Sequence, residues 1–342
     1  MNTQSPPTPL LQVTDLRVHL HTHQGAVDAV RGIDFTLHRG ETLGLVGESG
    51  CGKSLTALAL MGLLPDAAQA SGSILLDGQE LVGLDDRALC RLRGNRIGMV
   101  FQEPMTALNP VHRIGDQVAE PLRLHRGMGR AAARREALAL LERVGIADAA
   151  RRLDAYPHQF SGGQRQRITI AMALACGPDL LIADEPTTAL DVTVQQQILD
   201  LISDLVAERG MALILISHDL GVISQNADRM LVMYGGSVVE SGPTEAVFAT
   251  MAHPYTRGLF AARPQLLPRS PGERRRLSTI PGTVPELARL PAGCPFAGRC
   301  GFTVDACHTT PPPPVPLGSV DAGHMARCIR LDAMPAAPEV GA

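Results

Sequence analysis

The chain has few aromatic residues and little net charge. Its 342 residues include no tryptophan, aromatics make up 3%, and the formal net charge is −3. Proteins that bind single-stranded nucleic acid rely on aromatic stacking platforms and basic grooves, so this composition argues against nucleic acid as a partner. We interpret the arginine clusters at residues 130–135 and 274–276 as solvated surfaces of helices or loops.

Long hydrophobic runs are also missing. The longest, residues 168–176 and 212–216, are far shorter than the ~18 apolar residues of a membrane span. The first ten residues lack the basic and apolar regions of a secretory signal. We therefore expect a soluble, cytoplasmic chain that reaches a membrane only through a partner. Because disulfides are rare in that compartment, the seven cysteines are expected to remain thiols.

A phosphate-binding loop is the most informative feature present. Residues 47–54 read G-E-S-G-C-G-K-S, between an expected strand at 42–46 and an expected helix at 55–64. Glycines allow the backbone to approach a ligand closely, and the N–H groups at the start of the helix attract phosphate. Lys53 should reach the β- and γ-phosphates, and Ser54 should hold Mg²⁺. The expected nucleotide contacts in this loop are Gly47, Glu48, Ser49, Gly50, Cys51, Gly52, Lys53, Ser54 and Leu55.

A second motif fits the same ligand. Residues 180–185 read L-L-I-A-D-E, a buried strand that ends in two acids. Asp184 is placed to hold the Mg²⁺ that bridges the phosphates, and Glu185 is the natural general base for the attacking water. Such a run alone is a weak signal, and an acidic helix cap is the alternative. Downstream of a phosphate loop the signal is strong.

The order of elements predicts an α/β protein. Short strands are expected within residues 11–39, at 73–76 before an Asp-Gly turn, and at 96–102. An alanine-, arginine- and leucine-rich pattern at 106–152 predicts a separate helical insertion. Strands and helices then alternate, with helices expected at 192–208 and from Asp219, which implies a largely parallel sheet. The apolar strands do not alternate with polar residues, as expected when both faces are buried.

Composition changes beyond residue 263, where proline becomes frequent and periodicity is lost. We expect a small, loop-rich appendage to residue 331 and a disordered tail at 332–342. The appendage contains Cys294, Cys300, Cys307 and Cys328. Four cysteines in a segment too small for its own core suggest a metal staple. Zinc sites more often contain C-x-x-C pairs, which are absent here, whereas iron–sulfur clusters accept irregular spacing.

Between the two nucleotide motifs, residues 160–164 read F-S-G-G-Q. This segment resembles the L-S-G-G-Q signature of the ATP-binding subunits of ABC transporters, with Phe160 as a mild departure. Ser161 can cap the following helix, and the glycines expose backbone donors at its positive end. The resemblance covers roughly residues 10–262. It implies a RecA-like P-loop NTPase core with an antiparallel β subdomain and a helical subdomain at about 104–176.

The same resemblance assigns further site residues. It implies that Gln102 senses Mg²⁺ and the lytic water, that Asp191 belongs to a loop contacting a second ATPase, and that His218 contacts the γ-phosphate. It also implies that the signature faces the phosphate loop of that second ATPase, so hydrolysis needs a dimer. The signature residues are Ser161, Gly162, Gly163 and Gln164. The aromatic residue that usually stacks on adenine is missing, and Val27 is the expected substitute.

Three segments are similar to oligopeptide/dipeptide importer ATPases, namely residues 101–122, residues 253–259 and the C-P-F-A-G-R-C stretch of the appendage. This resemblance implies an ATPase at the cytoplasmic face of the membrane that powers peptide import. It implies two permease subunits, a sibling ATPase in preference to a second copy, and an extracytoplasmic binding protein. It also implies a [4Fe–4S] cluster on the four cysteines, favoured over Zn²⁺, with unligated thiols third. Nickel import is the alternative cargo, and a soluble ABC ATPase of translation or DNA repair is the rival class.

Overall fold

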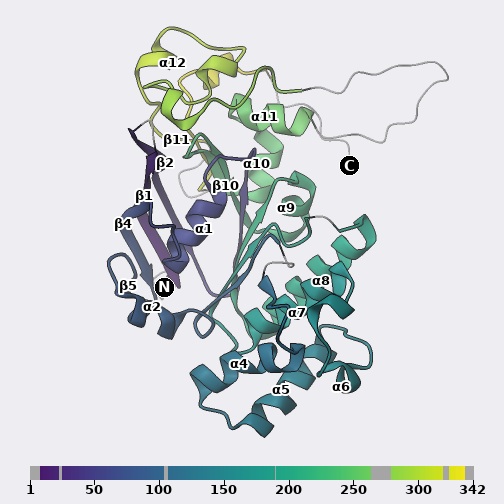
Figure 1. The fold of residues 1–342 in the computed structure, drawn as a ribbon. Coiled ribbons are helices and arrows are strands. Elements are labelled where there is room, and N and C mark those ends of the chain that lie inside the picture. Colours follow the sequence, from purple (N-terminus) through teal and green to yellow (C-terminus); the bar gives the residue numbers. More distant parts are fainter. Residues whose placement is uncertain are drawn as a thin grey trace, which may run out of the picture.

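Two sheets form the body of the protein (Figure 1). The computed structural model describes residues 8–22, 25–103, 107–188, 190–262, 279–318 and 323–335. The smaller sheet is antiparallel and has the order β2-β1-β4-β5. Its strands are β1 (Leu11–Thr22), β2 (Gly25–Leu37), β4 (Ala68–Leu76) and β5 (Gln79–Glu80). The first two strands are much longer than the short strands expected from the sequence.

The larger sheet has eight strands in the order β11-β12-β10-β9-β3-β8-β7-β6. The run from β9 to β6 is parallel, whereas β10, β11 and β12 pair in antiparallel fashion. Its strands are β3 (Thr42–Val46), β6 (Ile97–Val100), β7 (Leu180–Asp184), β8 (Ala212–Ser217), β9 (Arg229–Tyr234), β10 (Ser237–Pro243), β11 (Val315–Pro316) and β12 (Met325–Ala326). The sheet is thus largely parallel, with an antiparallel extension at one edge.

The central strands are buried on both faces. Every residue of β3, β7 and β8 is buried. Along β7, Leu180 and Ile182 pack with the smaller sheet and with α1 (Lys53–Met61), whereas Leu181 and Ala183 pack with the helices behind the larger sheet. Each fully buried Leu or Ile stabilises the fold by ~1.5–3 kcal/mol. The uninterrupted apolar runs therefore fix the strands that carry the site at their carboxyl ends.

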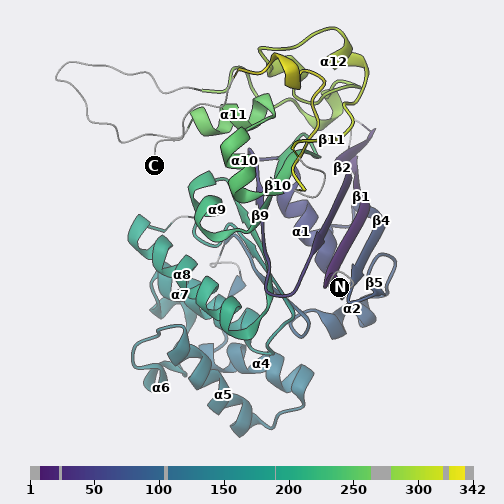
Figure 2. The ribbon, with the colours of Figure 1, turned by 180° about the vertical axis from the view of Figure 1, so that it is seen from behind.

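Helices connect these strands. Those within residues 114–209 lie on the side away from the smaller sheet, whereas α1 and α2 (Asp86–Leu92) lie beside it, as Figures 1 and 2 show from opposite sides. The helices up to residue 174 are α1 (Lys53–Met61), α2 (Asp86–Leu92), α4 (Ile114–Arg126), α5 (Arg130–Arg143), α6 (Ala149–Arg152) and α7 (Gly162–Leu174). The later ones are α8 (Val192–Arg209), α9 (Leu220–Asn226), α10 (Thr244–Thr250) and α11 (Pro254–Ala261). α1 ends three residues earlier than expected, because Gly62 adopts a left-handed cap with φ 60°.

The C-terminal region is irregular but joined to the main sheet. Its regular pieces are short, among them α12 (Ala306–Thr309), a 3₁₀ turn at Ala297–Arg299 and another at Leu331–Ala333. β12 pairs with β10, and the Arg327 N–H donates to the Val239 carbonyl at 2.8 Å. The appendage therefore extends the nucleotide-binding sheet. Of the expected disordered tail, residues 332–335 are described, and 336–342 lie outside the described residues.

Candidate nucleotide site and four-cysteine pocket

The loop between β3 and α1 has the backbone geometry that its glycines allow. Gly47 and Gly52 adopt φ values of 157° and 102°. A Cβ atom on Gly47 would lie 2.2 Å from the Met233 carbonyl oxygen, and one on Gly52 would lie 2.8 Å from the Ala29 carbonyl oxygen. No side chain of the described residues caps the start of α1 at Gly52. The first N–H groups of this helix are thus available to an anion.

Lys53 lies at the centre of this loop. Its side chain is buried, and Nζ donates to the Gly47 carbonyl at 2.7 Å and to the Glu48 carbonyl at 3.2 Å. The loop carbonyls hold the ammonium group inside the curve of the backbone. A triphosphate in the loop would offer Lys53 stronger, charged acceptors.

Asp184, at the end of β7, is a buried carboxylate with an unpaired oxygen. It is 5% exposed and accepts a hydrogen bond from Ser54, while its Oδ1 atom has no partner in the described part of the chain. Burial raises the pKa of Asp184, as does neighbouring Glu185, whereas Ser54 and Lys53 oppose the rise. A serine hydroxyl beside an orphaned carboxylate oxygen suits a hard divalent cation, so Ser54 and Asp184 fit the Mg²⁺ expected here.

Three side chains converge on one oxygen of Glu185. Its Oε2 atom accepts from Gln102 Nε2 at 3.1 Å and from Thr188 Oγ1 at 3.0 Å, and lies 3.2 Å from His218 Nδ1. The backbone adds a constraint, because Glu185 has a φ of 46° and its N–H donates to the Ile216 carbonyl at 3.0 Å. The carboxylate is therefore fixed in orientation.

These groups line an open pocket at the carboxyl ends of β7 and β8. Its lining comprises Glu185, Thr187, Thr188, Leu190, Gln195, Ser217, His218 and Asp219. A carboxylate held in this way can orient a water molecule and accept its proton. The structure brings together the predicted Gln102, Glu185 and His218. Thr188 was missed, because a threonine in a polar loop carries no distinguishing sequence signal.

The predicted signature begins α7. Ser161 is the N-cap, where its hydroxyl accepts from Gln164 N–H at 3.3 Å and Gln164 Oε1 accepts from Ser161 N–H at 3.1 Å. A Cβ on Gly163 would lie 2.8 Å from Val194 Cγ1, and Asp191 caps α8 by accepting from Val194 N–H at 3.0 Å. The starts of α7 and α8 therefore lie together. Ala189, part of the predicted contact loop, lies outside the described residues.

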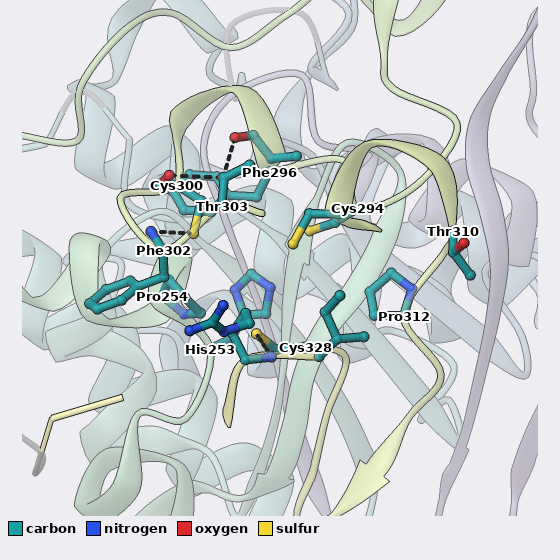
Figure 3. Close-up of a pocket in the computed structure, with 14 residues that line it drawn as sticks. His253, Pro254, Cys294, Phe296, Cys300, Phe302, Thr303, Thr310, Pro312 and Cys328 are labelled. Carbon is teal, nitrogen blue, oxygen red and sulfur yellow. Dashed lines mark hydrogen bonds between the residues drawn. The ribbon is translucent and has the colours of Figure 1, made fainter. Parts of the chain in front are cut away.

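The four appendage cysteines line one pocket (Figure 3). Burial raises the pKa of Cys294 to about 11, with smaller contributions from the other three cysteines, and burial also raises the pKa of Cys328. All seven cysteines of the chain are free thiols. Within the described ranges, no group of three or more His, Cys, Asp or Glu side chains is arranged to hold a metal ion.

His253 lies in the same pocket and was missed as a pocket residue. It is fully buried, which lowers its pKa to about 4, so the ring is neutral at pH 7. Nδ1 accepts from the Tyr255 N–H at 3.1 Å, which places the proton on Nε2. Nε2 has no hydrogen-bond partner among the described residues. The pocket thus contains four sulfur atoms and one unpaired donor.

The phosphate loop, the acid pair at the end of β7 and the parallel sheet that joins them define a P-loop ATPase cassette. Sequence profiles of known families agree with this class. The ABC transporter profile matches residues 30–188, and the profile of the oligopeptide/dipeptide transporter C-terminal region matches residues 239–307.

Curated relatives extend the match over nearly the whole chain. A peptide import ATP-binding protein of Brucella melitensis is 53% identical over 94% of this chain and 97% of its own length. The oligopeptide transport ATP-binding protein OppD of Salmonella typhimurium is 49% identical over 95% of both chains. The chain therefore belongs to the ABC transporter ATP-binding proteins of the oligopeptide/dipeptide transporter group. It is an ATPase coupled to transport, and this family works with membrane permeases.

Solved structures give the same cassette fold. One is a dimeric structure of the ATP-binding cassette MJ0796 with bound ADP and phosphate. It is 28% identical in sequence and has a TM-score of 0.62, and the match covers 68% of this chain and 98% of the MJ0796 chain. The cbiO1 subunit of a Clostridium perfringens ABC transporter complex is 29% identical, with a TM-score of 0.60, over 71% of this chain and 92% of that one. No helix in the described residues has the length and apolarity needed to cross a bilayer.

Proposed function

We propose that this protein hydrolyses ATP to drive the import of di- and oligopeptides across the cytoplasmic membrane. The observation that carries the cargo class is near full-length similarity to peptide import ATP-binding proteins, including the C-terminal region at residues 239–307. The hydrolytic step is supported by the fixed Glu185 carboxylate beside the phosphate loop.

We assign the residue roles as follows. Lys53 and the loop N–H groups bind the β- and γ-phosphates, and Ser54 and Asp184 hold Mg²⁺, which offsets charge on the phosphates when bound. Glu185 orients the attacking water and accepts its proton. Gln102, Thr188 and His218 keep Glu185 in that orientation, and His218 is close enough to the pocket to contact a γ-phosphate.

The complete site is formed by two ATPases. Ser161 and Gly162 are exposed at the start of α7, where free N–H groups can face the triphosphate of a second subunit. Asp191 lies beside this surface. The partner is a sibling chain in preference to a second copy, with a homodimer as the alternative. Because this chain contains every motif, it can supply its phosphate loop and base to one site and its signature to the other. Residues 10–262 form the ATP-binding unit, with a helical subdomain at about 104–176, and residues 263–331 form the appendage.

The remaining partners follow from the transporter group. Two permease subunits span the membrane, and the helices after Gln102 bind the cytoplasmic loop of one of them. An extracytoplasmic binding protein delivers the peptide. The ATPase lies on the cytoplasmic face as a peripheral subunit.

We further propose that Cys294, Cys300, Cys307 and Cys328 bind a [4Fe–4S] cluster. They share one pocket, and the buried Nε2–H of His253 gives that pocket an unpaired donor suited to a sulfur acceptor. Zinc sites usually contain C-x-x-C pairs, which this segment lacks, whereas iron–sulfur clusters accept irregular cysteine spacing, and this favours the cluster over Zn²⁺. When bound, the cluster would cross-link the four cysteines and so order the appendage.

The cluster is tested by anaerobic purification followed by iron, sulfide and zinc analysis. About four irons and four sulfides per chain, lost in Cys300→Ser and retained in Cys90→Ser, are expected. Cys90 is an exposed thiol of α2 and serves as the matched control. Stoichiometric zinc without iron would replace the cluster with the zinc alternative, and metal-free protein would leave the thiols unligated.

The import function is tested by purifying the tagged chain from detergent-solubilised membranes and identifying its partners. Two permeases and a second ATPase are expected, and the associated binding protein is then titrated with peptides and with nickel. Peptide binding supports the proposal, and nickel binding alone changes the cargo. Recovery with ribosomes or DNA, without permeases, would overturn the transport assignment.

A further inference from the structure

A residue of the C-terminal appendage is ion-paired to the phosphate loop. Arg299 Nη1 lies 2.6 Å from Glu48 Oε2, and Arg299 Nη2 lies 3.1 Å from Glu48 Oε1. This is a bidentate pair between residues 251 positions apart in the sequence. The Arg299 side chain is 6% exposed and that of Glu48 is 27% exposed. A forked, largely desolvated pair of this kind is among the stronger charged contacts in proteins.

Arg299 is itself held in place from other directions. Nε donates to the Pro281 carbonyl at 2.8 Å, and Nη1 also donates to the Tyr234 hydroxyl at 3.3 Å. The guanidinium therefore cannot leave Glu48 without losing contacts to two other segments. Its orientation is set by the fold of the appendage.

The main chain of Glu48 has a second attachment to the C-terminal half. Its N–H donates to the hydroxyl of Tyr255 at 2.7 Å. Tyr255 is fully buried and packs against the rings of Tyr234 and Phe296, at centroid distances of 4.6 and 5.4 Å. One residue of the phosphate loop is thus fixed by both its backbone and its side chain.

The charge of Glu48 makes this contact relevant to ATP. A carboxylate in a loop that receives a triphosphate repels the ligand unless a cation offsets it. Arg299 supplies that cation from outside the loop, while Lys53 remains directed at the loop interior. Without Arg299, the negative charge of the Glu48 carboxylate would remain uncompensated beside the phosphates.

We propose that Arg299 is a positioning residue of the ATP site, which offsets the Glu48 carboxylate and so makes nucleotide affinity depend on the C-terminal appendage. Arg299 acts through Glu48 and not on the reacting atoms. The inference requires only that the chain binds ATP, and it is independent of the peptide cargo and of any group bound by the cysteines.

The test compares ATP affinity and turnover in the full-length chain. Arg299→Met should raise the Kd for Mg-ATP about tenfold, the size expected for one unit charge acting over ~10 Å at an effective dielectric constant of ~20. The kcat at saturating ATP should change less than about twofold, because no catalytic group is touched. Arg299→Lys keeps the charge but not the fork, so its Kd should lie between those of Arg299→Met and the wild type.

A double variant separates charge from simple loss of structure. Glu48→Gln/Arg299→Met removes both charges and should recover most of the lost affinity. Arg289→Met is the matched control, because Arg289 lies in the same appendage, is 76% exposed and pairs only loosely with Glu286, at 3.4 Å. That control should bind ATP like the wild type.

Each result decides the proposal. An unchanged Kd in Arg299→Met, or a double variant that binds as weakly as Arg299→Met, would overturn it. If Arg299→Met does not fold, Glu48→Gln carries the test, because an unpaired Arg299 beside the loop should tighten ATP binding. Weaker binding by Glu48→Gln would refute the charge argument.

Discussion

Replacing Asp184 with Asn should stabilise the nucleotide-free protein while it removes Mg²⁺-dependent ATP binding. Asp184 is buried, Oδ1 has no partner among the described residues, and burial raises its pKa above the ordinary value. Asn would keep an acceptor at Oδ1, so the cost that it can relieve is the cost of burying the negative charge of the carboxylate. Asn keeps the shape and removes the charge, so we expect a gain of ~1–2 kcal/mol, or ~2–5 °C in Tm.

Thermal unfolding with and without ligand measures both effects. At 100 times its Kd, a ligand stabilises the folded state by ~2.7 kcal/mol. The wild type should gain this from Mg-ATP and much less from ATP with a chelator, whereas Asp184→Asn should show no difference between the two. The Asn variant should also have the higher Tm without nucleotide.

Asp179, which directly precedes β7, provides a control in which the same substitution should have the opposite effect on stability. Its carboxylate lies 2.7 Å from Arg39 and 2.6 Å from Arg96, and these contacts lower its pKa against the opposing effect of burial. Asp179→Asn should lower the free energy of unfolding, and with it the Tm. The loss should be modest, ~0.5–1 kcal/mol, because the ion pairs are partly exposed and screened by solvent.

The two variants should also respond oppositely to pH. The folded-state pKa of Asp184 is raised, so its penalty is full above that pKa and is relieved as the pH falls through it. The advantage of Asp184→Asn should then shrink in acid. The folded-state pKa of Asp179 is lowered, so its stabilisation is lost as the pH falls toward that pKa. A destabilised Asp184→Asn protein, or an advantage that grows in acid, would refute the reasoning.

Three further predictions concern the nucleotide site. Glu185→Gln should bind ATP but lose about 10²-fold or more in kcat, as measured by phosphate release, and retained turnover would remove Glu185 from the base role. Lys53→Ala should weaken equilibrium binding of ATP at least about tenfold, because its buried ammonium is the cation at the loop centre, and an unchanged Kd would contradict the loop assignment. ATP and GTP should bind with affinities within about threefold if Val27 takes the place of the stacking aromatic, because valine would offer apolar contact without stacking; a strong ATP preference would count against that position.

The sequence by itself determined the parts of the site that depend on neighbouring residues. The strand before Lys53 follows from a local apolar run, and the loop follows from its three glycines. The structure has this strand and the helix after the loop within a few residues of the expected bounds. The helix expected at 192–208 ends one residue later, where Gly210 provides a left-handed cap. These features depend on backbone preferences and on the burial of short segments. Both can be predicted from residues that are neighbours in the sequence.

Only the tertiary structure decided which distant residues meet. Nothing near Thr188 or His253 marks the first as a partner of Glu185 or the second as a donor facing four cysteines. The pairing of Arg299 with Glu48 joins opposite ends of the chain, through the antiparallel extension of the sheet and the packing of Tyr234 with Tyr255. Such contacts depend on the packing of the whole core. The chain contains many arginines, and only the fold determines which of them lies within hydrogen-bond distance of a given carboxylate.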